Sequence, residues 1–145
     1  IMLGIADGLE EKTGKPHHNL KAATFNEAVR EMSILSTALG ADPATAYGLP
    51  GVGDLEVTGL SGRNKVYGVR IGRGEGAKAA LATMAGLEQT VEGVPALPLA
   101  IQLVEQSAPQ IKEKLPLLYA ARRVVEADDP DYADIVAQAV LPPRP

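Results

Sequence analysis

The sequence predicts an all-α fold, and its composition and hydrophobic periodicity both support this. One Phe, four Tyr and no Trp leave a core of Ala, Leu, Val, Ile and Met, a set that favours helices over sheet. Apolar residues recur every three or four positions in several segments, which is the spacing of one helix face. No long segment alternates apolar and polar residues as a half-buried strand does. At 145 residues, the chain has the size of one domain and is long enough to bury a hydrophobic core.

The predicted helices follow one another along the chain with short connections. The apolar periodicity of a helix is already present at Ile1, as if the helix began further upstream, so we expect the chain to be part of a longer protein. The next pattern predicts a long central helix over 25–39, which Gly40 ends. Further helices are expected over 77–84, 96–104, 117–125 and 132–140.

Gly and Pro mark the expected breaks between these helices. Breaks are predicted at 13–19, 40–43, 48–53 and 72–76, and the Asp128-Asp129-Pro130-Asp131 segment is typical of a helix start. The helical domain is therefore predicted to span 1–141, and residues 142–145 are expected to form a frayed tail.

Charge and residue usage exclude several classes of protein. The net charge of −4 is spread along the chain, so no basic surface for nucleic acid is expected. No apolar run approaches the ~20 residues that a membrane span requires, and the first residues lack the charged and apolar pattern of a signal peptide, so we expect a protein that is not exported. The absence of Cys excludes disulfides, and we expect a cytoplasmic protein. No metal site is expected, because the adjacent His17 and His18 point apart and no ligand set completes them.

The segment from Gly51 to Leu55, followed by Arg63-Asn64, carries the chemistry of a small polyol phosphate site. Gly permits close backbone approach, Asp54 and Asn64 offer acceptors and donors, and Arg63 offers a planar cationic fork for phosphate. Thr58 follows Asp54 by one helical turn and would share its face. Two simpler interpretations stay open: Asp54 as a helix cap, and Arg63 as a surface residue of a helix that Ser61 caps.

These residues stand in a longer pattern. The segment 48–58, GLPGVGDLEVT, followed by Ser61-Gly62-Arg63-Asn64, resembles the C-terminal domain of NAD(P)-dependent glycerol-3-phosphate dehydrogenase. The similarity continues through Asn19 to Ala23, Ala38 to Pro43 and Val91-Glu92-Gly93, and extends to about residue 105. The resemblance implies the multi-helical domain shared by glycerol-3-phosphate and 6-phosphogluconate dehydrogenases, which binds substrate beside a Rossmann domain that this chain lacks.

The resemblance also implies roles for individual residues. Asp54 and Thr58 match a pair that polarises substrate near the reacting carbons, and Arg63 and Asn64 match phosphate ligands. Three residues match positions near the cofactor, which is NAD or NADP and is bound mainly by the absent domain: Arg63, Thr90 and Glu92. The implied reaction is reversible hydride transfer between NAD(P)H and dihydroxyacetone phosphate, giving sn-glycerol 3-phosphate.

The sequence departs from the family pattern at several places, among them Ser61-Gly62, where many bacterial relatives carry Gln-Ser. The family's catalytic lysine would lie upstream of Ile1, so no catalytic residue is expected within this chain, and the chain alone is predicted to be inactive. Asn26-Glu27 stands where many bacterial members carry Thr-Arg, and the role of this pair is left open.

Two other functions remain as alternatives. The first is the C-terminal domain of a related β-hydroxyacid or phosphogluconate-type dehydrogenase, which shares the architecture. The second is a non-catalytic helical dimerisation module whose apolar faces bind partners. A homodimer, the choice between NAD and NADP, and the activity of the parent protein are not decided by the sequence.

Overall fold

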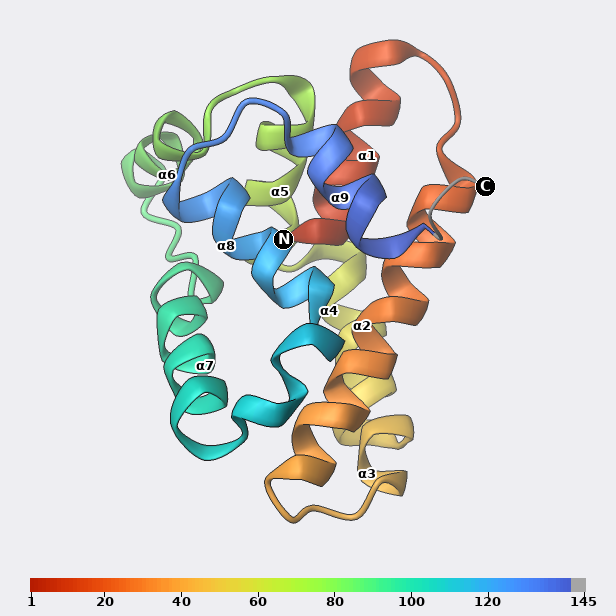
Figure 1. Ribbon diagram of the computed structural model, residues 1–145. Coiled ribbons are helices and arrows are strands. Elements are labelled where there is room, and N and C mark those ends of the chain that lie inside the picture. The colour runs from red at the N-terminus through yellow and green to blue at the C-terminus, as the bar shows by residue number, and fades with distance from the viewer. Residues whose placement is uncertain (142–145) are drawn as a thin grey trace.

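The computed structural model describes residues 1–141 and is all-α, as predicted, with no strand among those residues. Figure 1 shows α1 rising from the centre of the molecule to its upper right, α2 and α7 on opposite sides, and α8 and α9 across the front. The elements in chain order are α1 (Met2–Thr13), α2 (His18–Ala38), α3 (Ala44–Tyr47), η1 (Leu49–Gly53), α4 (Asp54–Ser61), α5 (Arg63–Arg73), α6 (Ala77–Gly86), α7 (Gly93–Ser107), η2 (Pro109–Lys114), α8 (Pro116–Glu126) and α9 (Tyr132–Val140). The predicted tail at 142–145 lies outside the described residues.

Helices α1 and α5 touch backbone to backbone through glycines. A Cβ on Gly4 would lie 2.2 Å from the carbonyl oxygen of Lys65, and one on Gly8 would lie 2.8 Å from the Cα of Gly72. From the other side, a Cβ on Gly68 would lie 2.0 Å from the carbonyl oxygen of Ile1. Small residues one turn apart on both helices therefore create a contact too close for any side chain.

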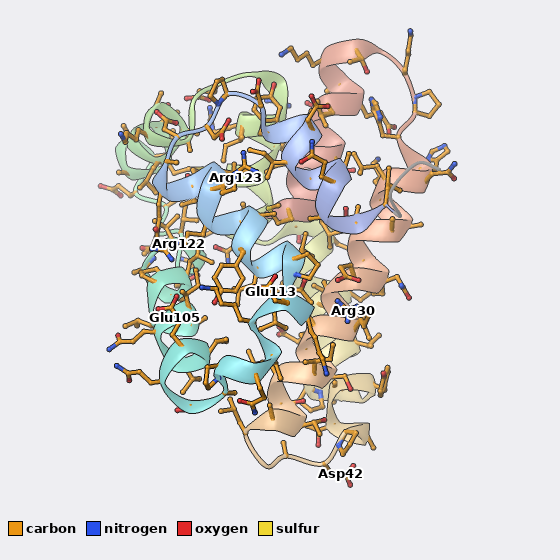
Figure 2. The ribbon with its side chains drawn as sticks, viewed as in Figure 1. Arg30, Asp42, Glu105, Glu113, Arg122 and Arg123 are labelled. Atoms are coloured by element: carbon orange, nitrogen blue, oxygen red, sulfur yellow. The ribbon has the colours of Figure 1, made fainter. Side chains whose placement is uncertain are left out.

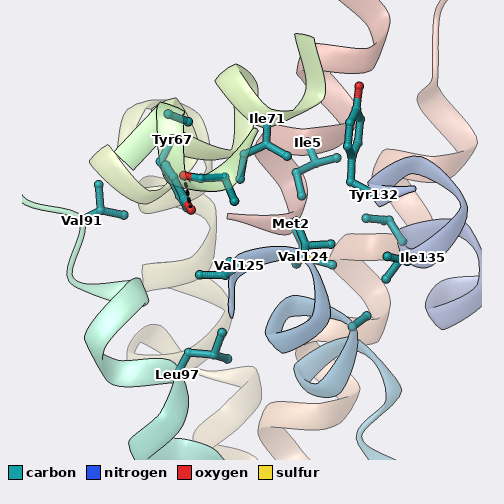
Figure 3. Close-up of a cluster of buried hydrophobic side chains, with 14 of the residues drawn as sticks. Met2, Ile5, Tyr67, Ile71, Val91, Leu97, Val124, Val125, Tyr132 and Ile135 are labelled. Atoms are coloured by element: carbon teal, nitrogen blue, oxygen red, sulfur yellow. Dashed lines mark hydrogen bonds between the residues drawn. The ribbon is translucent and has the colours of Figure 1, made fainter. Parts of the chain in front are cut away.

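The main hydrophobic core surrounds this glycine contact. Figure 3 shows Met2 and Ile5 of α1 beside Ile71 of α5, with Val124 of α8 packed against them. Tyr67 is buried to 1% exposure, and its hydroxyl donates to the carbonyl of Ala77 at 3.1 Å, which satisfies its only polar group. The core thus joins helices from both ends of the chain.

A buried carboxylate connects α2 to the start of α8. Glu31 is 8% exposed, and its two carboxylate oxygens accept the backbone N–H groups of Leu117 at 2.5 Å and Leu118 at 2.9 Å. These amides belong to the first turn of α8 and have no intrahelical partner, so Glu31 caps α8 from a distant part of the chain. Arg30 reaches the same junction, where it donates to the carbonyl of Lys114 at 2.7 Å (Figure 2).

Most predicted helices are present, with differences at their ends. The central helix starts earlier than predicted, at His18, and ends at Ala38, beyond which Gly40 adopts a positive φ of 89°. The break predicted at 48–53 is wrong in part, because Leu49–Gly53 forms a π-helical turn that runs directly into α4. A Cβ on Gly51 would lie 2.0 Å from the carbonyl oxygen of Ala46, so glycine at this position allows the π turn to pack on α3.

The Gly72→Ala substitution is expected to destabilise the protein by about 2–3 kcal/mol, because its Cβ would lie 2.2 Å from the carbonyl oxygen of Ile5. The matched control is Gly86→Ala in α6, where a Cβ would meet nothing within 4 Å and the unfolding free energy should hold or rise. Urea unfolding followed by circular dichroism measures both variants. Equal effects of the two substitutions would contradict the close α1–α5 contact.

A pH-dependent stability is expected from Glu31. Burial raises the pKa of Glu31 to about 7 from an ordinary value of 4.5, although the N–H groups of Leu117 and Leu118 act in the opposite direction. Between these values the native chain holds a proton that the unfolded chain has released. The stability that Glu31 contributes is therefore fully present below about pH 4.5 and is lost as the pH rises through 7.

Unfolding free energies measured from pH 4 to 8 test this assignment. The wild-type profile should fall over that range relative to the profile of Glu31→Gln, which has no ionisable group at this position. Glu113→Gln, on the exposed surface of η2, is the control and should follow the wild type. Parallel profiles for wild type and Glu31→Gln would show that Glu31 does not titrate in this range.

Candidate functional site

Helix α4 carries the first two predicted site residues. Asp54 is its first residue and follows the π turn without a break, so the interpretation of Asp54 as the helix cap is wrong; Gly53 occupies the cap position. Thr58 lies one turn later, and its hydroxyl donates to the carbonyl of Asp54 at 2.8 Å. Both residues are exposed. The Thr58 hydroxyl uses its proton within the helix, so it presents lone pairs to a ligand.

Helix α5 starts in the conformation of an anion site. Gly62 is the N-cap, with an extended ψ of 152° and no side chain to accept the first amides, so the interpretation with Ser61 as the cap is wrong. Within residues 1–141, the backbone N–H groups of Arg63 and Asn64 donate to no recorded acceptor. Free amides at the positive end of a helix favour a bound anion.

Arg63 and Asn64 meet the start of α7. The Arg63 guanidinium forms an ion pair with the carboxylate of Glu92, which is the N-cap residue of α7. The side-chain Oδ1 of Asn64 accepts the N–H of Gly93 at 2.9 Å. Because a backbone N–H can only donate, this bond fixes the orientation of the Asn64 amide, and its Nδ2 has no acceptor among residues 1–141.

The structure thus brings together three of the six predicted residues, Arg63, Asn64 and Glu92. Thr90 is exposed in the connection between α6 and α7 and lines a separate depression with Val91 and Val94. In the part of the chain that the structure describes, neither the Asp54 carboxylate nor the Thr58 hydroxyl has a recorded bond to Arg63 or Glu92. Apart from Thr90, the predicted site residues therefore form two groups, one on α4 and one where α5 meets α7.

Sequence reasoning missed a charged cluster beside these groups. Asp7 of α1 binds Lys65 of α5 at 2.8 Å and Lys21 of α2 at 2.6 Å, and Lys21 also pairs with Glu10 at 2.8 Å. Burial raises the pKa of Asp7, but hydrogen bonds from Lys21 and Lys65 outweigh it and hold the pKa below its ordinary value. The lysines and Asp7 line a pocket of about 300 Å³ between α1, α2 and α4.

The signal for this cluster was weak in the sequence. Lys65 follows Arg63-Asn64 directly, but the carboxylate that holds it lies in another helix. The open role of Glu27 also has a structural answer, since Glu27 pairs with Arg30 at 2.5 Å on α2.

Among residues 1–141, no group of His, Asp and Glu has the arrangement of a metal site. None of the described helices is long and apolar enough to cross a membrane.

Comparison with known proteins decides the family. Residues 1–133 match the family described as "NAD-dependent glycerol-3-phosphate dehydrogenase C-terminus". The chain belongs to this family. No solved structure matches the chain.

Relatives in this glycerol-3-phosphate dehydrogenase family are longer than the chain. Glycerol-3-phosphate dehydrogenase (NAD(P)+) of Symbiobacterium thermophilum is 36% identical over 152 residues, covering 97% of this chain and 42% of the relative. The protein of the same name from Geobacter metallireducens is 35% identical over 144 residues, covering 97% of the chain and 38% of the relative. That of Chlorobium limicola is 41% identical over 95 residues, covering 64% of the chain and 27% of the relative. The chain spans less than half the length of these relatives.

The capping role of Asn64 predicts different outcomes for two substitutions. Asn64→Ala should cost about 1 kcal/mol of unfolding free energy, because the Gly93 N–H loses its acceptor. Asn64→Asp keeps an acceptor and should retain the wild-type stability within about 0.5 kcal/mol. Urea unfolding compares the three proteins. If Asp at this position destabilised the fold as much as Ala, the bond from Gly93 to Oδ1 would not be the stabilising contact.

Proposed function

We propose that this chain is the substrate-binding domain of an NAD(P)-dependent glycerol-3-phosphate dehydrogenase. The observation that supports this most directly is the charge at the start of α5. Its first turn holds Arg63 and Lys65 and no acidic residue, although the positive end of a helix disfavours cations. Lys65 is compensated by Asp7, whereas the partner of Arg63 within residues 1–141 is the exposed Glu92. A phosphate would complete this arrangement.

The phosphate of the substrate is assigned to α5. The free amides of Arg63 and Asn64, the Asn64 Nδ2 and the Arg63 guanidinium are all donors, and together they match the acceptor oxygens of a phosphate ester. The side chains of Arg63 and Glu92 are 49% and 59% exposed. An ion pair so exposed to solvent is weak, so a dianionic phosphate can replace Glu92 on Arg63.

The carbon end of the substrate is assigned to α4. The reaction is reversible hydride transfer between NAD(P)H and dihydroxyacetone phosphate, giving sn-glycerol 3-phosphate. The Thr58 lone pairs suit a substrate hydroxyl, and the Asp54 carboxylate suits a second hydroxyl or the proton donor beside the carbonyl. The chain lacks the family's lysine, so the proton donor is assigned to residues outside it.

NAD or NADP supplies the hydride and is assigned mainly to a Rossmann domain outside this chain. The residues present here fit the edge of such a site. The Glu92 carboxylate is an acceptor for ribose or amide donors once Arg63 is engaged by phosphate, and the exposed Thr90 hydroxyl adds a donor and an acceptor. The expected homodimer and the cytoplasmic location stay predictions.

Titration of the chain with sn-glycerol 3-phosphate at constant ionic strength tests the phosphate assignment. Two-dimensional NMR should show shifts centred on the amides of Arg63, Asn64 and Gly93. Arg63→Ala and Asn64→Asp should weaken binding about tenfold or more, because each removes a donor from a charge-assisted contact. Arg123→Ala, an exposed arginine of α8 paired with Asp129, is the matched control and should bind as the wild type does.

The same titration separates the alternative functions. A β-hydroxyacid-type site would respond to 3-hydroxybutyrate, which should leave the Arg63 amide unshifted under the present proposal. A dimerisation module would self-associate in sedimentation measurements without binding any phosphate ester. Turnover of dihydroxyacetone phosphate by the chain alone would contradict the assignment of the proton donor and the hydride source to residues outside it.

A further inference from the structure

Lys65 connects the two groups of site residues, although no substrate contact is assigned to it. It stands in the first turn of α5, two residues after Arg63, and its ammonium donates to the carbonyl of Leu60 in the last turn of α4 at 3.2 Å. The same ammonium pairs with Asp7 of α1 at 2.8 Å. Lys65 therefore joins α5 to two other helices, α1 and α4, at the point where the chain passes from one group of site residues to the other.

The surroundings of Lys65 hold it in one place. Its side chain is 21% exposed and Asp7 is 23% exposed, so water screens this pair less than an exposed surface pair. Its backbone is fixed as well, since a Cβ on Gly4 would lie 2.2 Å from the Lys65 carbonyl oxygen. Lys21 binds the other oxygen of Asp7 at 2.6 Å and limits the movement of that carboxylate.

The Leu60 carbonyl gives this contact its effect on α4. A helix leaves its last carbonyls without intrahelical partners, and a cation near that end is favourable. The chain turns from α4 to α5 at Gly62, whose N–H donates to the Thr58 carbonyl at 2.9 Å and whose carbonyl accepts the N–H groups of Lys65 at 2.8 Å and Val66 at 3.1 Å. The bond from the Lys65 ammonium to the Leu60 carbonyl adds a side-chain link across this turn, beside its backbone bonds.

We propose that Lys65, held by Asp7, is a positioning residue that sets the separation between Asp54 and Thr58 on α4 and Arg63 and Asn64 on α5. The inference rests on the proposed function, because it concerns a substrate that spans both groups. A ligand that touches both groups gains from their fixed separation, since binding of one end holds the other end near its partners. A ligand that touches only α5 gains nothing from it.

Two probes distinguish these cases. Inorganic phosphate engages only the α5 group, whereas sn-glycerol 3-phosphate engages both groups. Their dissociation constants are measured by NMR at constant ionic strength for wild type, Lys65→Met, Lys65→Arg and Asp7→Asn. Lys78→Met, an exposed lysine at the start of α6, is the control for lost charge.

The positioning role predicts a selective loss. Lys65→Met and Asp7→Asn should weaken sn-glycerol 3-phosphate about five- to tenfold and inorganic phosphate less than twofold. Lys65→Arg, which keeps a cation able to reach Asp7 and the Leu60 carbonyl, should restore most of the affinity for sn-glycerol 3-phosphate. The Asp7 variant keeps the Lys65 side chain, so it tests the pair even if Lys65→Met does not fold.

Other outcomes overturn one proposal or the other. Equal weakening of both probes by Lys65→Met would mean that Lys65 acts only through its charge, and the positioning role would be wrong. Unchanged affinities in all variants would also refute it. If neither probe bound the wild type near Arg63, the proposed function itself would fail, a result that is distinct from any change among the variants.

Discussion

The contact between the glycine faces of α1 and α5 is the constraint on which the rest of the structure depends. The two helices approach until backbone meets backbone, and this leaves their relative height and rotation almost no freedom. That placement puts Asp7 beside Lys65 and fixes where the first turn of α5 stands. The remaining helices pack around the pair, and Met2, Ile5 and Ile71 supply the apolar surface that they bury. The glycine contact between α1 and α5 thus determines where the Asp7–Lys65 ion pair lies.

The chemistry of the candidate site arises from positions where ordinary helix ends are left incomplete. Gly62, the N-cap of α5, has no side chain to accept the first amides, and the Asn64 side chain is engaged with α7, so the donors at the start of α5 are available to a ligand. The exposed pairing of Arg63 with Glu92 neutralises the charge without burying it. The missing side-chain cap makes α5 slightly less stable. It also leaves several hydrogen-bond donors close together, as is common at helix N-termini that bind anions.

The sequence was sufficient for most of the helices, because periodicity is a local signal, and the assignment of the site residues, which also used local patterns, stays a prediction. Periodicity located α6 to α9 to within a few residues, and the match of Arg63 and Asn64 to a phosphate pattern required only neighbouring positions. Contacts between distant segments could not be predicted. The capping of α8 by Glu31, the pairing of Asp7 with Lys65 and the bond from Gly93 to Asn64 each join different helices. The π turn at Leu49–Gly53 was also missed, since Pro50 and the glycines around it are equally typical of a loop.

The cap that Glu31 provides also concerns how the domain opens and closes. Helix α8 cannot satisfy its first amides until α2 lies against it, and α2 leaves a carboxylate buried among apolar side chains if α8 moves away. Neither helix can fray at this junction without a loss to the other. Helices α2 and α8, from the N-terminal and C-terminal thirds of the chain, are therefore expected to open as one cooperative unit, in which protection from hydrogen exchange is shared across the junction.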